Sequence, residues 1–389
     1  MPQRLTIAAA RPARGKAGAA AGAALAALAA LAAGCAPAGQ AGQVVLHADF
    51  ESPAERARWI PFGWAAIGKN IFWTEGQAHG GQWALGMGPA PKFPSSGGWE
   101  SPTFPLAAGQ YYRLTFWSHA PQGGFWVVQY HDEYGNDLPG DHYSRFEPSD
   151  DWRRNTFFFK TKFPAISAVV AFHPSEPGDV RIDDVRVEAA TWRDAAAWAD
   201  EVYAAMPAIA DRSPPGAGRH MPRTLAALRR GEALRFVLLG DSIANDLSNS
   251  PFDALVLRHF PRASIDVRFS GRGGTGWRKY KQQVEQRVLS HRPDLLIFLA
   301  LSNDAATVQE DLRAIIRSVR RLRPQTEMLL ITEPPCALHR DPNVAANREL
   351  SLAVAAEEGI EAIDLQTLWG GYLRDSGKEA SWPMRDRLH

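Results

Sequence analysis

Cysteine is almost absent from this sequence, which has two, Cys35 and Cys336, in 389 residues. So few thiols exclude a disulfide framework. No group of cysteines and histidines has the spacing of a zinc site, so a metal-dependent hydrolase is not favoured. Charge of one sign is lacking as well. The 43 basic and 42 acidic residues leave a net charge of +1, which gives no polybasic surface for nucleic acid.

Long hydrophobic runs are also scarce, and the one that stands out lies near the start, at Ala17–Ala33. Basic residues precede it, and Gly34-Cys35 follow it. We interpret residues 1–35 as an export signal. A transmembrane anchor is the alternative, but the run is mostly alanine, is shorter than a typical span and has no stop-transfer charges after it.

The end of this segment, Leu31–Cys35, resembles a bacterial lipobox. The resemblance implies that Cys35 is lipidated and becomes the N-terminus after cleavage. Ala32 occupies the position where that motif usually has leucine, which keeps plain secretion as an alternative. We expect an exported protein, either a cell-envelope lipoprotein that touches the membrane through its lipid anchor only or a secreted protein. Residues 36–42 are small and polar enough to serve as a tether.

A length of 389 residues favours two folded domains beside the targeting segment. From residue 43 to 190, short apolar runs alternate with Gly, Pro, Asn and Asp turns, which predicts an antiparallel β-sandwich. Such runs include Gln43–Leu46, Tyr111–Trp117, Phe125–Tyr130, Thr156–Phe159, Ala168–Phe172 and Val180–Val187.

Tryptophan is concentrated in this segment, which holds eight of the thirteen in the chain. One sandwich core cannot hide them all, so some are expected on a face or loop where flat rings can stack on sugars. For any single tryptophan a packing role is the better prediction, above all for Trp117 and Trp126, which lie inside strand-like runs.

Three stretches of this segment resemble the galactose-binding-like carbohydrate-binding modules: His47–Glu51, Ala78–Leu85 and Ile182–Val185. The resemblance implies a jelly-roll sandwich with a polysaccharide or oligosaccharide partner. It also implies a structural calcium ion where the first and last strands meet, with Glu51 and Asp183 as oxygen ligands. Surface carboxylates next to a bulge are the alternative interpretation of this pair.

Residues 191–231 are predicted to connect the two domains. Apolar residues at helical spacing predict a helix from Thr191 to about Ile209, a Pro/Gly stretch at 213–218 marks a seam, and a short helix follows at Arg223–Arg230.

Residues 232–389 alternate strand and helix, which predicts a three-layer α/β domain with a five-stranded parallel sheet. The active site of such a sheet lies at the carboxyl ends of its strands. Predicted strands are 234–239, 264–269, 294–300, 327–332 and 360–364, and predicted helices lie near 252–260, 278–290, 305–322 and 344–358.

Distinctive polar clusters follow these strands. Ser242 comes directly after the first strand, where backbone N–H groups can stabilise an oxyanion, although Gly-Asp-Ser alone is ordinary turn chemistry. A glycine-rich loop at 271–276 follows the second strand. It lacks the Lys-Ser/Thr ending of a phosphate-binding loop. Asn303 follows the third strand, as an oxyanion donor or as a helix N-cap.

The last cluster is Asp386 and His389 at the end of the sequence. Three residues apart, the carboxylate can hold the imidazole tautomer while the other ring nitrogen takes a serine proton. By itself a terminal histidine is more often a frayed tail.

Taken in order, these clusters resemble the four motif blocks of the SGNH hydrolase family, which has a flavodoxin-like fold. The resemblance implies Ser242 as nucleophile, His389 as general base and Asp386 as the carboxylate that orients it. The implied oxyanion donors are the Ser242 backbone, the Asn303 side chain and the loop glycine Gly274, with Gly273 as an alternative. No cofactor is implied for catalysis.

Two features depart from the family pattern. Leu301 stands where the third block usually begins with glycine. The family normally continues past the histidine into a closing helix, so the sequence is either a fragment or holds its base differently. The implied function is an esterase that removes acetyl or other short acyl groups from carbohydrate. The alternatives are an acyltransferase with the same residues and an inactive sugar-binding lipoprotein.

Overall fold

The computed structural model describes residues 40–63, 65–88, 97–175, 178–208, 216–299, 305–334 and 342–379. Ala38–His389 form one compact unit. Within the described residues, no helix is both long enough and apolar enough to span a bilayer. The predicted export signal and Cys35 lie outside the described residues.

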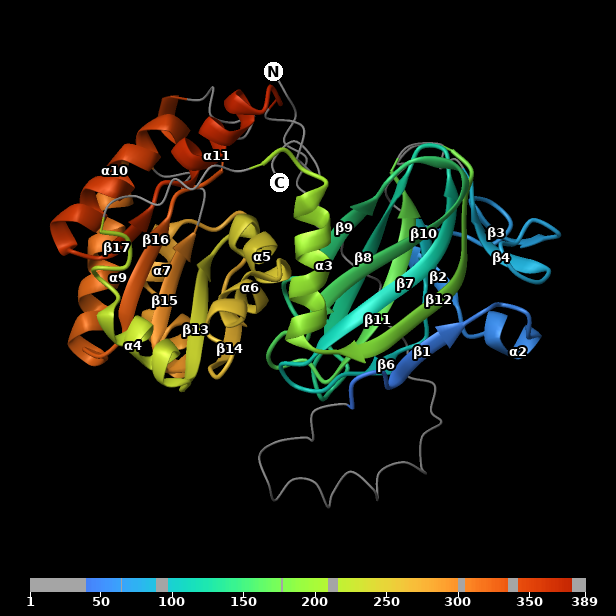
Figure 1. Ribbon diagram of the computed structural model, residues 1–389, viewed down its shortest axis with the longest axis horizontal. Helices are drawn as coiled ribbons and strands as arrows, with labels where there is room; N and C mark the ends of the chain where they lie inside the picture. Colours follow the sequence, from blue (N-terminus) through green and yellow to red (C-terminus); the bar gives the residue numbers. More distant parts are fainter. Residues whose placement is uncertain are drawn as a thin grey trace, which may run out of the picture. The chain divides into compact units, whose positions relative to one another are not determined.

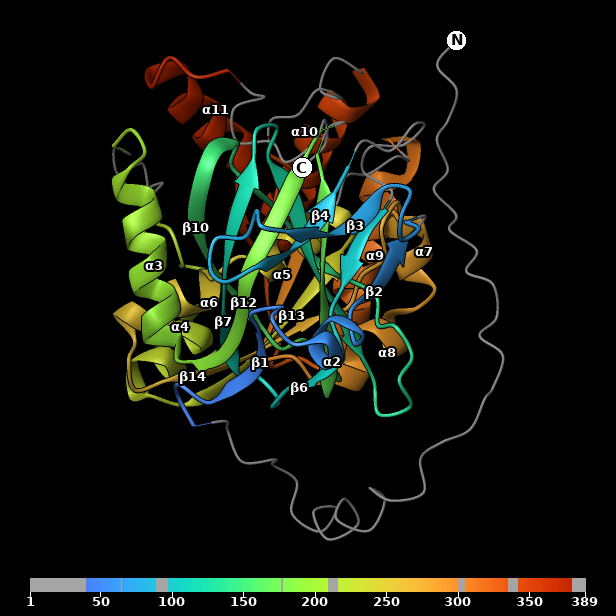
Figure 2. The same ribbon diagram turned by 90° about the vertical axis from the view of Figure 1, so that its right-hand side faces the viewer.

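The N-terminal half consists of two antiparallel sheets, which Figure 1 shows on its right-hand side. The first sheet has the order β10-β7-β12-β4-β3, with β1 added on β12, and Figure 2 shows β10, β7 and β12 side by side. Its strands are β1 (Val44–Ala48), β3 (Ile71–Glu75), β4 (Trp83–Met87), β7 (Tyr111–Ala120), β10 (Ser149–Lys160) and β12 (Val180–Ala190).

The second sheet has the order β2-β5-β11-β8-β9, with β6 added on β11. Its strands are β2 (Ile60–Gly63), β5 (Gly97–Glu100), β6 (Phe104–Pro105), β8 (Gly124–His131), β9 (His142–Phe146) and β11 (Ser167–Pro174). Each of the six predicted strands overlaps an observed one. The other six were missed because they are short or carry glycine, proline and charge, which weakens any alternation signal.

Large aromatic side chains from both sheets form the core of the sandwich. Trp99, Trp126, Phe116 and Phe172 are at most 1% exposed, and Phe116 and Phe172 meet edge to face with ring centroids 4.8 Å apart. Side chains alternate between the two faces of a strand, so the residues next to these lie on the outer faces.

Short helices flank the sandwich and lead to the next domain: α2 (Pro53–Arg56), α3 (Trp192–Ala204) and α4 (Pro222–Arg230). At the start of α3, the Thr191 side chain accepts from the Asp194 N–H, while the Asp194 carboxylate accepts from the Thr191 N–H. This reciprocal cap stabilises the first turn of the helix. The helix ends at Ala204, before the predicted residue 209, and Pro207 follows, which cannot continue a helix.

The C-terminal half is built on a parallel sheet of five strands, as predicted, and their order is β14-β13-β15-β16-β17. Its strands are β13 (Ala233–Gly240), β14 (Ser264–Phe269), β15 (Leu295–Leu299), β16 (Glu327–Ile331) and β17 (Glu361–Ile363). The apolar runs bury both faces of this sheet. Val237 and Leu239 pack on one side with residues of α7–α10, and Phe236 and Leu238 pack on the other with α4 and α6.

The helices of this half are α5 (Ser242–Asn249), α6 (Phe252–His259), α7 (Trp277–Lys281), α8 (Val284–Arg287), α9 (Val308–Leu322), α10 (Pro342–Glu358) and α11 (Leu365–Asp375), with 3-10 turns η1 (Leu289–His291) and η2 (Ala305–Thr307).

The single helix predicted at 278–290 is wrong, because the segment is divided into α7, α8 and η1. The breaks allow Trp277, Tyr280, Val284 and Val288 all to be buried against the same face of the sheet. The helices α5 and α11 were missed. The sequence of α5 is rich in Ser, Asn and Asp, which have low helix propensity.

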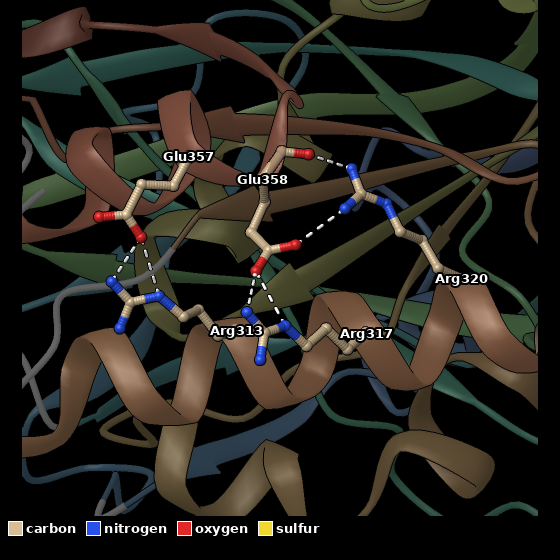
Figure 3. A network of polar contacts seen from close by, with 5 residues as sticks. All are labelled: Arg313, Arg317, Arg320, Glu357 and Glu358. Carbon is tan, nitrogen blue, oxygen red and sulfur yellow. Dashed lines mark hydrogen bonds and ion pairs between the residues drawn. The ribbon is translucent and has the colours of Figure 1, made fainter.

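Ion pairs join α9 to the end of α10 (Figure 3). Arg313 contacts Glu357, and Arg317 and Arg320 both contact Glu358, with Nε–Oε distances of 3.0 Å for the first pair and 2.9 Å for Arg317 and Glu358. The Glu358 side chain is 10% exposed, so this network is less screened by solvent than ordinary surface pairs. It holds the outer helices of the layer that covers Trp277 and Tyr280.

Candidate active site

Ser242 is the first residue of α5, immediately after strand β13. Asp241 caps the helix, and its Oδ1 accepts a hydrogen bond of 2.9 Å from the Ile243 N–H. The first N–H groups of a helix have no partner within it, and the helix dipole favours negative charge at this end. The half-buried Ser242 therefore lies at the amino end of a helix directly after the first strand, the position that the sequence predicted for it.

Glycine is required at the end of β13. A Cβ on Gly240 would lie 1.7 Å from the Leu299 carbonyl oxygen at the end of β15, too close for any side chain. The two residues face each other in the register of these parallel strands. The close approach brings the turn before Ser242 against the end of the neighbouring strand β15.

The glycine-rich loop lies against the same turn. A Cβ on Gly271 would be 2.1 Å from the Gly240 carbonyl oxygen, so only glycine permits the contact. Gly274 is exposed and has a φ of +65°, a left-handed conformation that favours glycine. Arg272, Gly273 and Gly274 line a surface depression together with Thr275. The structure thus brings the loop that contains Gly274 to the turn that carries Ser242.

The other predicted site residues, Asn303, Asp386 and His389, lie outside the described residues, and so does Leu301. Their roles remain predictions. The alternative of Asn303 as an N-cap also remains open at this point.

Helix α5 is held by residues from the N-terminal half of the same compact unit. The Lys162 ammonium donates to Asn245 Oδ1 at 2.5 Å, and the side-chain amides of Asn245 and Asn249 donate to the Asp141 carbonyl at 3.0 Å and 3.1 Å. Burial lowers the pKa of Lys162 to about 7. Sequence reasoning missed these contacts, since no motif marks them.

Glu51 and Asp183, the predicted calcium ligands, both lie against the loop 79–83. Glu51 Oε1 accepts from the N–H groups of Gln82 and Trp83, at 2.8 Å and 2.9 Å. Asp183 Oδ2 accepts from those of His79 and Gly80, at 2.9 Å and 3.0 Å. The pair therefore converges on one loop, as a shared cation site requires, but each carboxylate already has backbone donors.

Asp183 is fully buried, and this burial raises its pKa to about 6. With His79 and Asp184 it forms the one group of possible metal ligands among the described residues, and their ligand atoms lie within 4.8 Å of one another. Glu51 is not part of that group.

Trp117 has the packing role that the sequence predicted, but on an outer face of the sandwich and not in its core. Trp117 is half-buried and follows the core residue Phe116 in β7, so its side chain lies on the outer face. The His79 ring stacks on it, with centroids 3.7 Å apart, and Trp152 meets His79 edge-on at 5.9 Å. Trp126, in contrast, is buried as predicted. Trp64 lies outside the described residues.

Comparison with known proteins adds a family for the C-terminal half. Residues 238–389 match the model of the GDSL-like Lipase/Acylhydrolase family. A search of curated proteins finds no match.

Three solved structures illustrate the likeness. A two-domain esterase active on acetylated mannans is 21% identical with a TM-score of 0.39, over 46% of this chain and 49% of that one. An acetylxylan esterase from Geobacillus stearothermophilus is 17% identical with a TM-score of 0.31, over 36% and 80%. The xylan-binding domain CBM22-1 from Paenibacillus barcinonensis is 14% identical with a TM-score of 0.31, over 40% and 99%. The chain thus spans about half the length of the two-domain esterase.

The matched segment contains Ser242 at the helix start and the glycine loop that lies against it. Residues 238–389 are therefore a GDSL-like lipase/acylhydrolase domain, an enzyme domain of the SGNH esterase type.

Proposed function

We propose that this protein is a cell-envelope esterase that removes acetyl or other short acyl groups from carbohydrate by a Ser-His-Asp mechanism. The observation that carries the proposal is the position of Ser242 at the amino end of α5, within the acylhydrolase domain and beside the loop of Gly274. Ester hydrolysis needs a nucleophile and oxyanion donors at one place.

In the proposed mechanism, Ser242 Oγ attacks the acyl carbon while His389 takes the hydroxyl proton and Asp386 orients the imidazole. The Ser242 and Gly274 N–H groups and the Asn303 amide stabilise the tetrahedral oxyanion. Collapse breaks the ester bond, and His389 protonates the departing sugar oxygen. Water then attacks the acyl-serine and gives a proton to His389. The acyl–Oγ bond breaks, His389 returns the proton to Ser242 Oγ, and the free acid leaves.

The full chain should be assayed on short acyl esters and on acetylated mannan and xylan, with release of acetate as the measurement. Hydrolysis predicts free acetate in proportion to polysaccharide deacetylated. An acyltransferase, the alternative with the same residues, predicts acetate on an added deacetylated acceptor. An inactive sugar-binding protein predicts neither product, and that outcome would contradict the proposed function.

Sugar binding by the sandwich is the second part of the proposal. Trp152 is half-buried at the outer face of the first sheet and meets the His79 ring edge-on, whereas His79 stacks on the face of the Trp117 ring. We expect Trp152→Ala to weaken binding of a deacetylated mannan or xylan by the full chain about tenfold, the loss of roughly 1.4 kcal/mol of stacking. Affinity electrophoresis measures it.

Tyr134→Ala is the matched control, because Tyr134 is 81% exposed and belongs to no such cluster among the described residues. Equal binding by wild type and Trp152→Ala would exclude this face as the sugar site.

A structural calcium ion at loop 79–83 is proposed as well, supported by the burial of Asp183 beside Asp184 and by the convergence of Glu51 on the same loop. A cation bound to the native state stabilises it by mass action, by about 2.7 kcal/mol at a concentration 100 times the Kd. Chelation should therefore lower the melting temperature of wild type but not that of Asp183→Asn. The exposed Asp150→Asn is the control. If the chelator leaves the melting temperature of wild type unchanged, the backbone donors alone satisfy these carboxylates.

Export and lipidation through Cys35 complete the proposal. In a bacterial host the full chain should sediment with membranes and Cys35→Ser should not. Wild type found free in the periplasm would favour secretion without an anchor.

A further inference from the structure

A tyrosine hydroxyl joins the two backbone segments that the proposed mechanism uses as oxyanion donors. The Tyr280 hydroxyl, on α7, donates to the Gly240 carbonyl at 2.6 Å and accepts from the Arg272 N–H at 2.9 Å. Gly240 precedes the turn to Ser242, and Arg272 lies in the loop that leads to Gly274. A single buried oxygen thus bridges the nucleophile turn and the glycine loop.

The bridge belongs to a tight junction. The Arg272 N–H also donates to the Gly240 carbonyl, at 3.1 Å, so the three groups form a triangle. Gly271 and Gly240 are both buried here, and a Cβ on Gly271 would lie 2.1 Å from the Gly240 carbonyl oxygen. The loop therefore approaches the turn more closely than any side chain at position 271 would allow.

The surroundings fix the tyrosine itself. Tyr280 is 1% exposed, its ring lies 6.2 Å from that of Trp277, and Trp277 meets Phe298 of β15 edge to face at 5.9 Å. Burial raises the pKa of Tyr280 to about 12, so the phenol stays protonated and remains a donor to Gly240. The packing of the buried ring holds the hydroxyl within hydrogen-bond distance of both Gly240 and Arg272.

We propose that Tyr280 is a positioning residue of the esterase, which sets the spacing between the Ser242 N–H and the Gly274 N–H through its hydrogen bonds to Gly240 and Arg272. The inference rests on the proposed function. Tyr280 touches no reacting atom. Its effect is on the geometry of the oxyanion donors, which stabilise the transition state more than the bound substrate.

Tyr280→Phe removes the bridging oxygen and keeps the ring. We expect kcat for a short acyl ester to fall on the order of 10-fold to 100-fold, as for a small misplacement of catalytic groups, with KM changed less than about threefold. The rate of covalent inactivation by a fluorophosphonate should fall in parallel, because the phosphorus adduct needs the same oxyanion donors.

Tyr112→Phe is the matched control. Tyr112 is 2% exposed in the sandwich, and its hydroxyl accepts from the Ala107 N–H at 2.8 Å. Tyr112→Phe also removes a hydroxyl oxygen that is hydrogen-bonded to the backbone, but away from the junction. We expect it to lower the melting temperature by as much as such a loss does in general and to leave kcat unchanged.

Gly271→Ala is the second variant, and it tests the junction without altering Tyr280. Its new methyl group must push the loop away from the Gly240 carbonyl. We expect a similar loss of kcat, and the double variant should lose less than the product of the two, because both changes open one junction.

A normal kcat and inactivation rate in Tyr280→Phe, with only the melting temperature lowered as in Tyr112→Phe, would overturn the inference and leave the esterase intact. If Tyr280→Phe does not fold, a normal kcat in folded Gly271→Ala has the same consequence. Wild type without ester hydrolysis would contradict the proposed function instead.

Discussion

Replacing Ser242 with alanine should reduce kcat for short acyl esters on the order of 10⁴-fold to 10⁶-fold, the range for loss of the nucleophile of a catalytic triad. The physical reason is that the two-step route through an acyl-serine disappears, whereas the oxyanion donors and substrate binding stay. Since α5 is capped by Asp241 and not by Ser242, the melting temperature should change little. Rates of ester hydrolysis by the full chain, without and with the substitution, measure the effect.

Ser248→Ala is a matched control on the same helix. The Ser248 hydroxyl donates to the Asn245 carbonyl at 2.7 Å, within α5 itself. Ser248→Ala removes a serine hydroxyl near the other end of α5, away from the nucleophile. Its kcat should stay within about twofold of wild type, as for a substitution outside the active site.

Fluorophosphonate labelling separates an active enzyme from the inactive alternative even when the natural ester is unknown. Covalent capture requires an activated serine, so wild type and Ser248→Ala should be labelled at Ser242, and Ser242→Ala should not be labelled. A folded wild-type chain that reacts at no serine would remove both the esterase and the acyltransferase and leave a sugar-binding protein.

His389→Ala should lower kcat by nearly as much as Ser242→Ala, and the double variant should be no worse than either single one. Nucleophile and base act as a unit, so once one is lost the other has nothing left to contribute. Asp386→Asn, which leaves an amide in place of the orienting carboxylate, should cost on the order of 10⁴-fold, because the imidazole then takes the wrong tautomer.

His259→Ala is the control for the histidine. His259 is exposed at the end of α6, and its loss should leave kcat unchanged. Asn303→Ala completes the series. It should lower kcat on the order of 10²-fold to 10³-fold, because one oxyanion donor is lost. Full activity in His389→Ala, with Ser242→Ala inactive, would mean that another residue is the base and that the resemblance of the last motif was misleading.

The contacts of helix α5 decide which form of the protein these experiments need. Lys162 and Asp141 belong to the N-terminal half, yet they bind Asn245 of α5, one turn beyond Ser242. Asp253 of α6 is 2% exposed and pairs with Lys160 and Tyr111 of the sandwich. Cutting the chain between the two halves would leave a buried carboxylate without its cation, which is strongly destabilising. These experiments therefore need the full chain.

Several parts of this architecture follow from local sequence alone. The mostly apolar run at Leu234–Leu239 predicts a strand buried on both faces, which places Gly240-Asp241-Ser242 directly after it at the carboxyl edge of the sheet. Thr191 with Asp194 marks a helix start in the same way. These signals are strong because they depend on neighbours within a few residues in the chain.

Other parts were decided only by tertiary contacts. The Tyr280 hydroxyl bridges Gly240 and Arg272, and Trp117 lies under the ring of His79 on an outer face. Their partners are distant in the chain. The buried Tyr280 hydroxyl lies where polar backbone groups at a strand end need a hydrogen-bond partner. The face on which Trp117 lies depends on the alternation of side chains along its strand. Both depend on which segments become neighbours in the folded sheet, which local patterns do not determine.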